Sequence, residues 1–269
     1  MAALVWIRLH LFLCSMVFLQ AGVAVATPVL RVAIEEADNR PYEYRDEAGQ
    51  WTGYHIEAIR AAASRMGVEI KILPLPWSRA LAMLKNGEVE AASYVASTPE
   101  RAEWAVFYPG NSLHIPQARL YILRSRAAQI SWQGSFAALI GHWQVGGARG
   151  YYYGPEWTPL LTTSSNADLS APNQQALMRM LLRKRIDIAI GSVDMPTQLA
   201  DELPEIAGKV IALDGVARTG QPIYIAFNRR TADDKARRFA DILGELRQDG
   251  TLRRLALRFN VLGSANLQP

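Results

Sequence analysis

Residues 42–101 read YEYRDEAGQWTGYHIEAIRAAASRMGVEIKILPLPWSRALAMLKNGEVEAASYVASTPER, and this stretch decides the fold. Its first clear pattern is helical, because Ile56, Ile59, Ala63 and Met66 fall on one face at positions i, i+3, i+7 and i+10. Gly67 follows at once and is a typical residue after a helix end. The stretch therefore predicts an amphipathic helix that begins near Tyr54.

A strand and a second helix follow, and the order then repeats. Residues 68–73 favour a strand, Ser78 can cap a helix that ends at Asn86-Gly87, and residues 89–95 favour another strand. Strand–helix units in tandem predict a parallel α/β sheet. Such sheets bind ligands at the carboxyl ends of their strands, so the turn Ser97–Arg101 is where we expect a bound anion.

The flanking sequence continues the α/β pattern on both sides. Strands are expected over 30–34, 119–123, 186–190 and 223–227, and helices over 136–140, 174–185, from Thr231 onward and over 251–259. Residues 159–172 are rich in Ser, Thr and Asn and are expected to form a loop with at most a short strand. Two α/β blocks result, one before about residue 113 and one after it.

Residues 1–26 have the pattern of an export signal. A weakly basic start at Arg8 and His10 precedes an apolar run over 11–24, and Ala24-Val25-Ala26 offers small residues for cleavage. A retained membrane anchor is the alternative, but the apolar run is short for one. The chain's single cysteine, Cys14, lies inside this segment, so the exported part is expected to have neither a thiol nor a disulfide.

Charge and motifs exclude several function classes. Residues 27–269 hold 28 basic and 25 acidic residues, and this formal charge of +3 is too small and dispersed for a nucleic-acid-binding protein. The histidines at 10, 55, 114 and 142 are interpreted as isolated, without metal-ligand spacing. No nucleophile elbow or phosphate-binding loop is present, so we expect no enzyme activity, metal or cofactor.

Several motifs resemble family 3 of the bacterial extracellular solute-binding proteins. They run in the family's order over almost the whole chain after the signal: PYEYRD (41–46), WTGY (51–54), LPWSRAL (75–81), GEVEA (87–91), TPERAE (98–103), YIAFN (224–228) and DGTL (249–252). The resemblance implies a two-lobed periplasmic-binding-protein-like (type II) fold. Lobe 1 would span 27–113 and 224–269, and lobe 2 would span 114–223, with hinge segments near 111–115 and 221–224.

The resemblance also implies a site in the cleft between the lobes. In the family, the Arg of the TPER motif holds a ligand carboxylate, which would be Arg101 here; a planar guanidinium suits that role. A local ion pair with Glu100 or Glu103 is the alternative. Family members place small or hydroxyl residues on the strand before this Arg. The equivalent positions here are Ser93, Tyr94 and Ala96.

Lobe 2 departs further from the family pattern. Tyr151 stands where a Thr is common, and Ser192 stands where an acidic residue usually pairs the ligand's ammonium, with Asp194 two residues later. Arg149 and the adjacent tyrosines suggest an anionic or aromatic ligand, although strand-like alternation would hide some of the rings.

Two more residues are candidates in lobe 1. Trp77 could stack on a ligand or pack in the core, and Glu36 could meet a ligand amine or remain a solvated loop carboxylate.

The leading hypothesis is a monomeric periplasmic receptor. It would capture a small polar or anionic solute, such as an amino acid or related carboxylate, and present it to an ABC permease in the inner membrane. The alternatives are a receptor for a membrane signalling partner and an exported dehydratase-like enzyme, because fold does not fix function.

Overall fold

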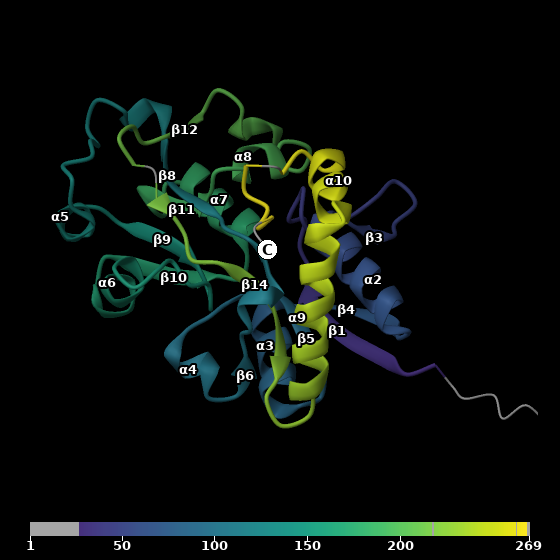
Figure 1. Ribbon diagram of the computed structural model, residues 1–269. Coiled ribbons are helices and arrows are strands. Elements are labelled where there is room, and N and C mark those ends of the chain that lie inside the picture. Colours follow the sequence, from purple (N-terminus) through teal and green to yellow (C-terminus); the bar gives the residue numbers. More distant parts are fainter. Residues whose placement is uncertain (1–26, 217, 262, 268–269) are drawn as a thin grey trace, which may run out of the picture.

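The structure is a computed structural model that describes residues 27–216, 218–261 and 263–267. The expected signal over 1–26 lies outside the described residues. The described chain forms two α/β units, each built on its own sheet, as the motif resemblance predicts (Figure 1). The expected two-lobed architecture is therefore confirmed.

The first sheet has the strand order β4-β1-β5-β14-β6, and β7 also pairs with β14. Its strands are β1 (Val29–Glu35), β4 (Glu69–Leu75), β5 (Ala91–Ala96), β6 (Ala105–Val106), β7 (Ser112–His114) and β14 (Ile223–Asn228). β1 is parallel to β4 and β5, whereas β14 is antiparallel to β5, β6 and β7. A small hairpin of β2 (Tyr44–Arg45) and β3 (Trp51–Thr52) stands apart from it.

The second sheet has the order β10-β9-β11-β8-β12, with β13 paired to β8. Its strands are β8 (Gln117–Leu123), β9 (Val145–Ala148), β10 (Ala167–Ala171), β11 (Ile188–Ser192), β12 (Val210–Ala212) and β13 (Arg218–Thr219). β9 is parallel to β10 and β11, and β8 is antiparallel to β11, β12 and β13. Each sheet thus combines a parallel group with antiparallel strands.

Helices flank both sheets (Figure 1). Around the first sheet lie α2 (Tyr54–Met66), α3 (Trp77–Asn86), α4 (Pro99–Ala102), α9 (Asp233–Gln248) and α10 (Thr251–Arg258). Around the second lie α5 (Phe136–His142), α6 (Trp157–Thr163), α7 (Gln174–Leu182) and α8 (Met195–Gln198).

The chain passes between the sheets twice, between β7 and β8 and between β13 and β14. These passages lie where the sequence predicts the hinge segments. On this basis we propose that residues 27–113 with 224–269 form lobe 1 and that residues 114–223 form lobe 2. The boundaries themselves stay predictions.

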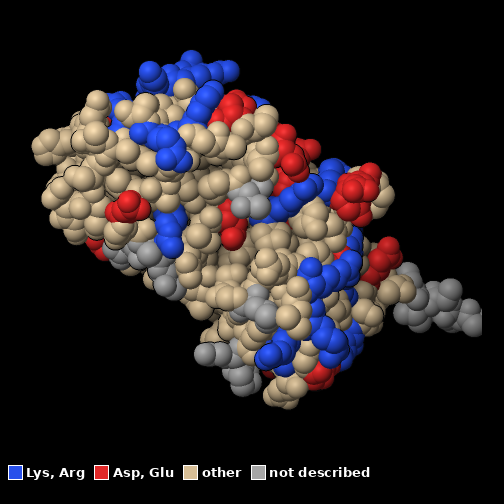
Figure 2. All heavy atoms as spheres, turned by 90° about the horizontal axis from the view of Figure 1, so that it is seen from above, with Lys and Arg blue, Asp and Glu red and all other residues tan. Residues whose placement is uncertain are grey.

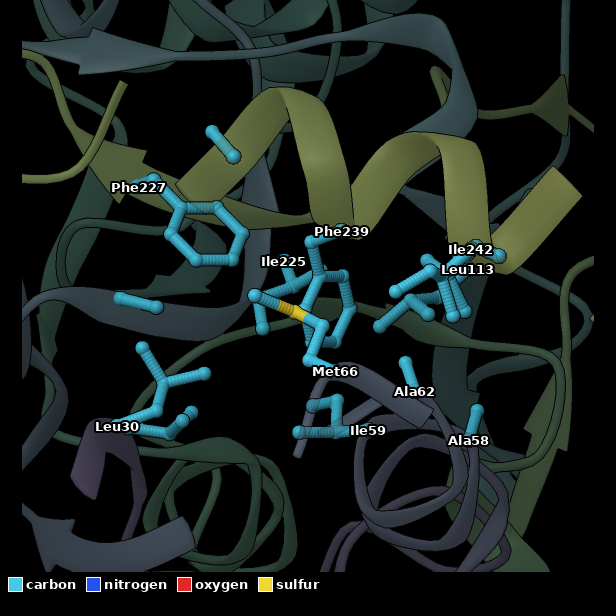
Figure 3. Close-up of a cluster of buried hydrophobic side chains, with 14 of the residues drawn as sticks. Leu30, Ala58, Ile59, Ala62, Met66, Leu113, Ile225, Phe227, Phe239 and Ile242 are labelled. Carbon is cyan, nitrogen blue, oxygen red and sulfur yellow. The ribbon is translucent and has the colours of Figure 1, made fainter. Parts of the chain in front are cut away.

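The core of lobe 1 brings together segments from both ends of the chain. Figure 3 shows Phe227 and Ile225 of β14 and Phe239 of α9 near Ile59 and Met66 of α2. The rings of Phe227 and Phe239 are fully buried, with their centroids 5.4 Å apart. Burying such side chains supplies most of the stabilising free energy, at about 25 cal/mol per Å² of apolar surface. The C-terminal third of lobe 1 therefore holds its N-terminal part in place.

Most predicted elements are present, with local corrections. Gly67 ends α2 in the left-handed conformation, with a φ of 70°. The predicted Ser78 cap is wrong, because Pro76 precedes the first turn of α3 and no side chain caps it. The predicted loop over 159–172 is also wrong in its first part, which belongs to α6: Trp157 and Leu161, one turn apart, are buried in the core of lobe 2.

Charged side chains of both signs are interspersed on the face seen in Figure 2, in keeping with the small formal charge. Within the described residues, no helix combines the length and the apolar character needed to cross a bilayer.

Candidate ligand-binding site

A cavity of about 360 Å³ lies between the two lobes. Residues that line it from lobe 1 include Glu35, Trp77, Tyr94, Ala96 and Arg101, and those from lobe 2 include Gln117, Gly150, Tyr151, Tyr152, Tyr153, Glu156, Trp157, Gln174 and Ser192. This volume suits a small organic molecule. Aromatic side chains from both lobes make up much of the wall.

The cavity lies at the carboxyl ends of the parallel strands. Glu35 is the last residue of β1, Trp77 follows the end of β4, and Ala96 is the last residue of β5. In lobe 2, β9 ends just before the Gly150 turn and β11 ends at Ser192. Parallel strands end at the same edge of a sheet, so the two sheets present these residues toward a shared space.

Among the described residues that line the cavity, Arg101 is the only cation, and it is buried. It lies on α4, whose first turn is capped by the Thr98 hydroxyl, which accepts a hydrogen bond from the Arg101 backbone N–H. Its guanidinium donates to the carbonyl oxygens of Ala96, at 3.0 Å, and of Gly150 in lobe 2, at 2.6 Å. Burial lowers the pKa of Arg101, but a guanidinium remains charged at neutral pH.

Trp77 contributes a second contact to the same lobe-2 carbonyl. Its indole N–H donates to the oxygen of Gly150 at 3.2 Å, and its ring meets the ring of Tyr151 edge-on. Gly150 has a φ of 76°, which a residue with a side chain adopts only with strain. The Gly150 turn therefore brings its carbonyl oxygen within reach of both lobe-1 donors.

Tyr94 of β5, the strand that precedes the Ser97–Arg101 turn, has an unusual backbone conformation. Tyr94 has a φ of 65°, which disfavours any side chain by about 1–2 kcal/mol. Its ring is held by the aromatic rings of Tyr42, His55 and His114, at centroid distances of 5.9, 5.0 and 5.2 Å. This packing offsets the strain and fixes Tyr94 in the cavity wall.

Glu35 is a cavity residue that the sequence reasoning missed. The residue is 5% exposed, and Tyr151 and Asn39 both donate hydrogen bonds to its Oε2. Burial raises the pKa of Glu35 to about 7, and the two hydrogen bonds only partly oppose that shift. The Tyr151 bond joins lobe 2 to lobe 1. The position of Glu35 at the end of a parallel strand is a sequence feature that points to the cavity. The alternation of side chains along a strand does not decide whether Glu35 or Glu36 faces that cavity.

Lobe 2 contributes polar groups around the end of β11. The Ser192 hydroxyl is buried and has no hydrogen-bond partner among the described residues, and the Gln174 side chain accepts a long hydrogen bond from the Ser192 backbone N–H, at 3.4 Å. Both residues line the cavity. Neither is ionisable in the neutral range, so this position carries no acid that could pair with an ammonium.

Six of the ten predicted site residues line the cavity, namely Trp77, Tyr94, Ala96, Arg101, Tyr151 and Ser192. The structure places the other four elsewhere. Ser93 is fully buried inside β5, and the exposed Arg149 donates to the carbonyl of Ser170.

The remaining two lie near the cavity but outside its lining. Asp194 accepts from the Tyr42 hydroxyl at 3.5 Å, and burial raises its pKa. Glu36 is exposed and lines a separate crevice.

Two of the histidines are not isolated, so that prediction is wrong. His55 Nδ1 lies 3.1 Å from Glu43 Oε1, and His55 Nε2 lies 2.8 Å from His114 Nδ1; all three side chains are fully buried. Tyr42 stacks on His114 with centroids 4.2 Å apart. Burial raises the pKa of Glu43 to about 7 and lowers that of His55 to about 3. The chain Glu43–His55–His114 is therefore uncharged near pH 6 and supports the Tyr94 wall from behind.

Solved structures with the same architecture match over most of this chain. A histidine kinase sensor domain with similarity to periplasmic binding proteins is 20% identical, with 88% of this chain and 97% of that chain covered and a TM-score of 0.73. An amino acid ABC transporter substrate-binding protein of Streptococcus pneumoniae bound to L-arginine is 20% identical, with 87% and 95% covered and a TM-score of 0.67.

A third similar structure is an ancestral amino acid-binding protein described as a precursor of cyclohexadienyl dehydratase. It is 20% identical, with 86% of this chain and 95% of that chain covered and a TM-score of 0.66. At these identities the likeness shows the fold alone. No curated protein sequence matches this chain.

The sequence itself matches a family model over residues 30–261. That range includes both sheets, apart from Val29 at the start of β1, and every cavity-lining residue named above. The chain therefore belongs to the bacterial extracellular solute-binding proteins, family 3.

Proposed function

We propose that this protein is a periplasmic receptor that closes its two lobes around a small organic carboxylate and presents it to an ABC permease. The observation that carries this proposal is the buried Arg101 in a cavity of about 360 Å³ between the lobes. A charged guanidinium there favours an anion, since each charge-assisted hydrogen bond contributes about 1.5–3 kcal/mol.

The ligand class follows from the other walls. Trp77, Tyr94, Tyr151, Tyr152 and Tyr153 all line the cavity and supply flat apolar faces with polar edges. The Gly150 turn breaks the expected strand alternation, which is why three successive tyrosines reach the same space. With Ser192 at the position of the ammonium-pairing acid, an aromatic or otherwise apolar carboxylate fits these walls better than an α-amino acid does.

Contacts between the lobes support a hinge mechanism. Arg101 and Trp77 donate to Gly150, and Tyr151 donates to Glu35, so five cavity residues join the two lobes directly. A ligand that adds contacts to both lobes would shift the population toward this closed arrangement. The permease would then recognise the surface of the closed form. The receptor would be a monomer that is exported by the signal at residues 1–26.

The test is binding of organic acids to residues 27–269, measured by thermal shift and calorimetry. Candidate ligands are aromatic carboxylates, small dicarboxylates and amino acids. For any ligand found, Arg101→Ala should weaken binding by about 2–4 kcal/mol. Arg149→Ala is the matched control, because that exposed Arg lies outside the cavity, and it should change affinity by less than about 0.5 kcal/mol.

Two other results would redirect the proposal. Equal affinity of the two variants would remove Arg101 from the site. Conversion of a bound acid into a product would favour the enzyme alternative, for which the cavity carboxyl of Glu35, with a pKa of about 7, is the group suited to proton transfer.

A further inference from the structure

The carboxyl group of Glu35 has its two oxygens in different surroundings. Oε2 accepts both hydrogen bonds, one from the Tyr151 hydroxyl and one from the Asn39 amide at 3.0 Å. Oε1 is buried and has no hydrogen-bond partner among the described residues, although Glu35 lines the cavity. An ionised carboxylate would leave charge on a buried oxygen with nothing to stabilise it, which is costly.

We infer that Glu35 holds a proton on Oε1 and donates that O–H to an acceptor atom of the bound organic anion. Oε2 then acts as the carbonyl oxygen that accepts from Tyr151 and Asn39. This inference rests on the proposed function and specifies its ligand: a carboxylate for Arg101 and a second acceptor, such as a hydroxyl or keto oxygen, for Glu35. Anion binding is consequently linked to proton retention at Glu35.

The charged and titratable groups around Glu35 agree with a neutral carboxyl. They are Glu43, Tyr94, Arg101, Tyr151, Tyr153 and Glu156. A charge on Glu43 disfavours a negative charge on Glu35, and burial raises the pKa of each of the three tyrosine hydroxyls, so they are neutral in this pH range. Within the described residues no ion pair joins Arg101 to Glu35, and Glu156 is exposed to solvent. Burial accordingly moves the pKa of Glu35 upward to about 7.

The competing interpretation gives the opposite pH dependence. An ionised Glu35 could pair through Oε1 with a ligand ammonium, and affinity would then rise as the pH rises through the pKa of Glu35. A protonated Glu35 that donates to an anion loses its proton over the same range, so affinity would fall. The two interpretations therefore differ in sign.

The experiment uses two probes that differ in one group, 3-phenyllactate with an α-hydroxyl and L-phenylalanine with an α-ammonium. The Kd of 3-phenyllactate should rise about tenfold between pH 6 and pH 8, as loss of one proton with a pKa near 7 requires. Glu35→Gln should keep the affinity seen at pH 6 and remove the pH dependence, since its amide N–H still donates and its oxygen still accepts. Glu36→Gln, at the exposed neighbour, should behave as the wild type.

A second measurement needs no ligand. Carboxyl ¹³C signals of glutamate-labelled protein, with Glu35 assigned by its loss in Glu35→Gln, should show this group titrating near neutral pH. If Glu35 stays ionised down to pH 5, the inference is overturned, whichever ligand binds. The inference is also overturned if L-phenylalanine binds more tightly as the pH rises and this binding is lost in Glu35→Gln. Titration near pH 7 with neither probe bound would leave the proton on Glu35 supported and would count against the proposed ligand.

Discussion

The buried His55 makes a quantitative prediction about acid stability. Burial lowers its pKa to about 3 in the folded protein, whereas an unfolded histidine titrates near 6.5. Below pH 6.5 the unfolded chain therefore binds a proton that the folded chain does not, so the stabilising contribution of neutral His55 is complete above pH 6.5 and is lost as the pH falls. At pH 4.5 the loss is about 2.7 kcal/mol of unfolding free energy.

Glu43 acts in the opposite direction in the same chain of hydrogen bonds. Its pKa is raised to about 7, so the folded state holds a proton that the unfolded state has released, and its contribution improves toward acid. The absolute pH profile therefore mixes both signs. The informative quantity is the difference between variants, in which the other titrating groups largely cancel.

The assay is urea unfolding of the wild type, His55→Gln and His142→Gln at pH 7 and pH 4.5. Between these pH values, His55→Gln should lose about 2.5 kcal/mol less stability than the wild type, because Gln cannot take up the proton. His142→Gln is the control: His142 is exposed and its Nδ1 lies 2.9 Å from the carbonyl oxygen of Ala138 in its own helix, so the stability that this variant loses should equal that of the wild type.

The same acid loss in wild type and His55→Gln would refute this reasoning and would indicate a His55–Glu43 ion pair in the folded state. If the variant does not fold, imidazole NMR signals of the wild type give the answer. The His55 signal should stay constant from pH 7.5 to pH 5, and a midpoint at or above 6.5 would contradict its buried neutral state.

Three further substitutions test the packing and the lobe contacts. Gly53→Ala should cost at least about 3 kcal/mol by urea unfolding, because Gly53 has a φ of 116° and its Cβ would lie 2.3 Å from a backbone oxygen, whereas Gly49→Ala, with open space around it, should cost about 1 kcal/mol. Trp77→Phe removes the N–H bond to Gly150 and should weaken ligand binding by about 1 kcal/mol in calorimetry; unchanged affinity would mean that the bond does not favour closure. Phe239→Ala should cost about 3–5 kcal/mol in thermal or urea unfolding, and a much smaller value would indicate a core that refills the space.

The fold could be predicted where a local pattern decides it. The helix from Tyr54 to Met66 lies where the sequence predicts it, because its apolar spacing and the following Gly67 are both local signals. The loop prediction over 159–172 failed because propensity was weighed above burial. Trp157 and Leu161 anchor α6 in the core of lobe 2, and tertiary packing overrides weak local preference.

The site could be predicted only in part, for a similar reason. Arg101 was found through a motif, but Glu35 and His114 acquire their roles from partners far along the chain: Tyr151 is 116 residues from Glu35, and His55 is 59 residues from His114. Strand alternation cannot choose between Glu35 and Glu36 without knowing which face is covered. The Gly150 turn likewise decides which of Arg149 and the tyrosines turns inward.

The position of β14 has a consequence for how the protein reaches its native state. This strand is interior to the first sheet, between β5 and β6, yet nearly 190 residues separate it from β1 in the chain. Lobe 1 therefore cannot complete its sheet until the ribosome has made the segment that includes Asn228, and pairings this distant in sequence form slowly. During synthesis the incomplete sheet keeps an open edge at β5, where β14 pairs in the finished fold, so lobe 1 cannot reach its native packing before residue 228 has been made.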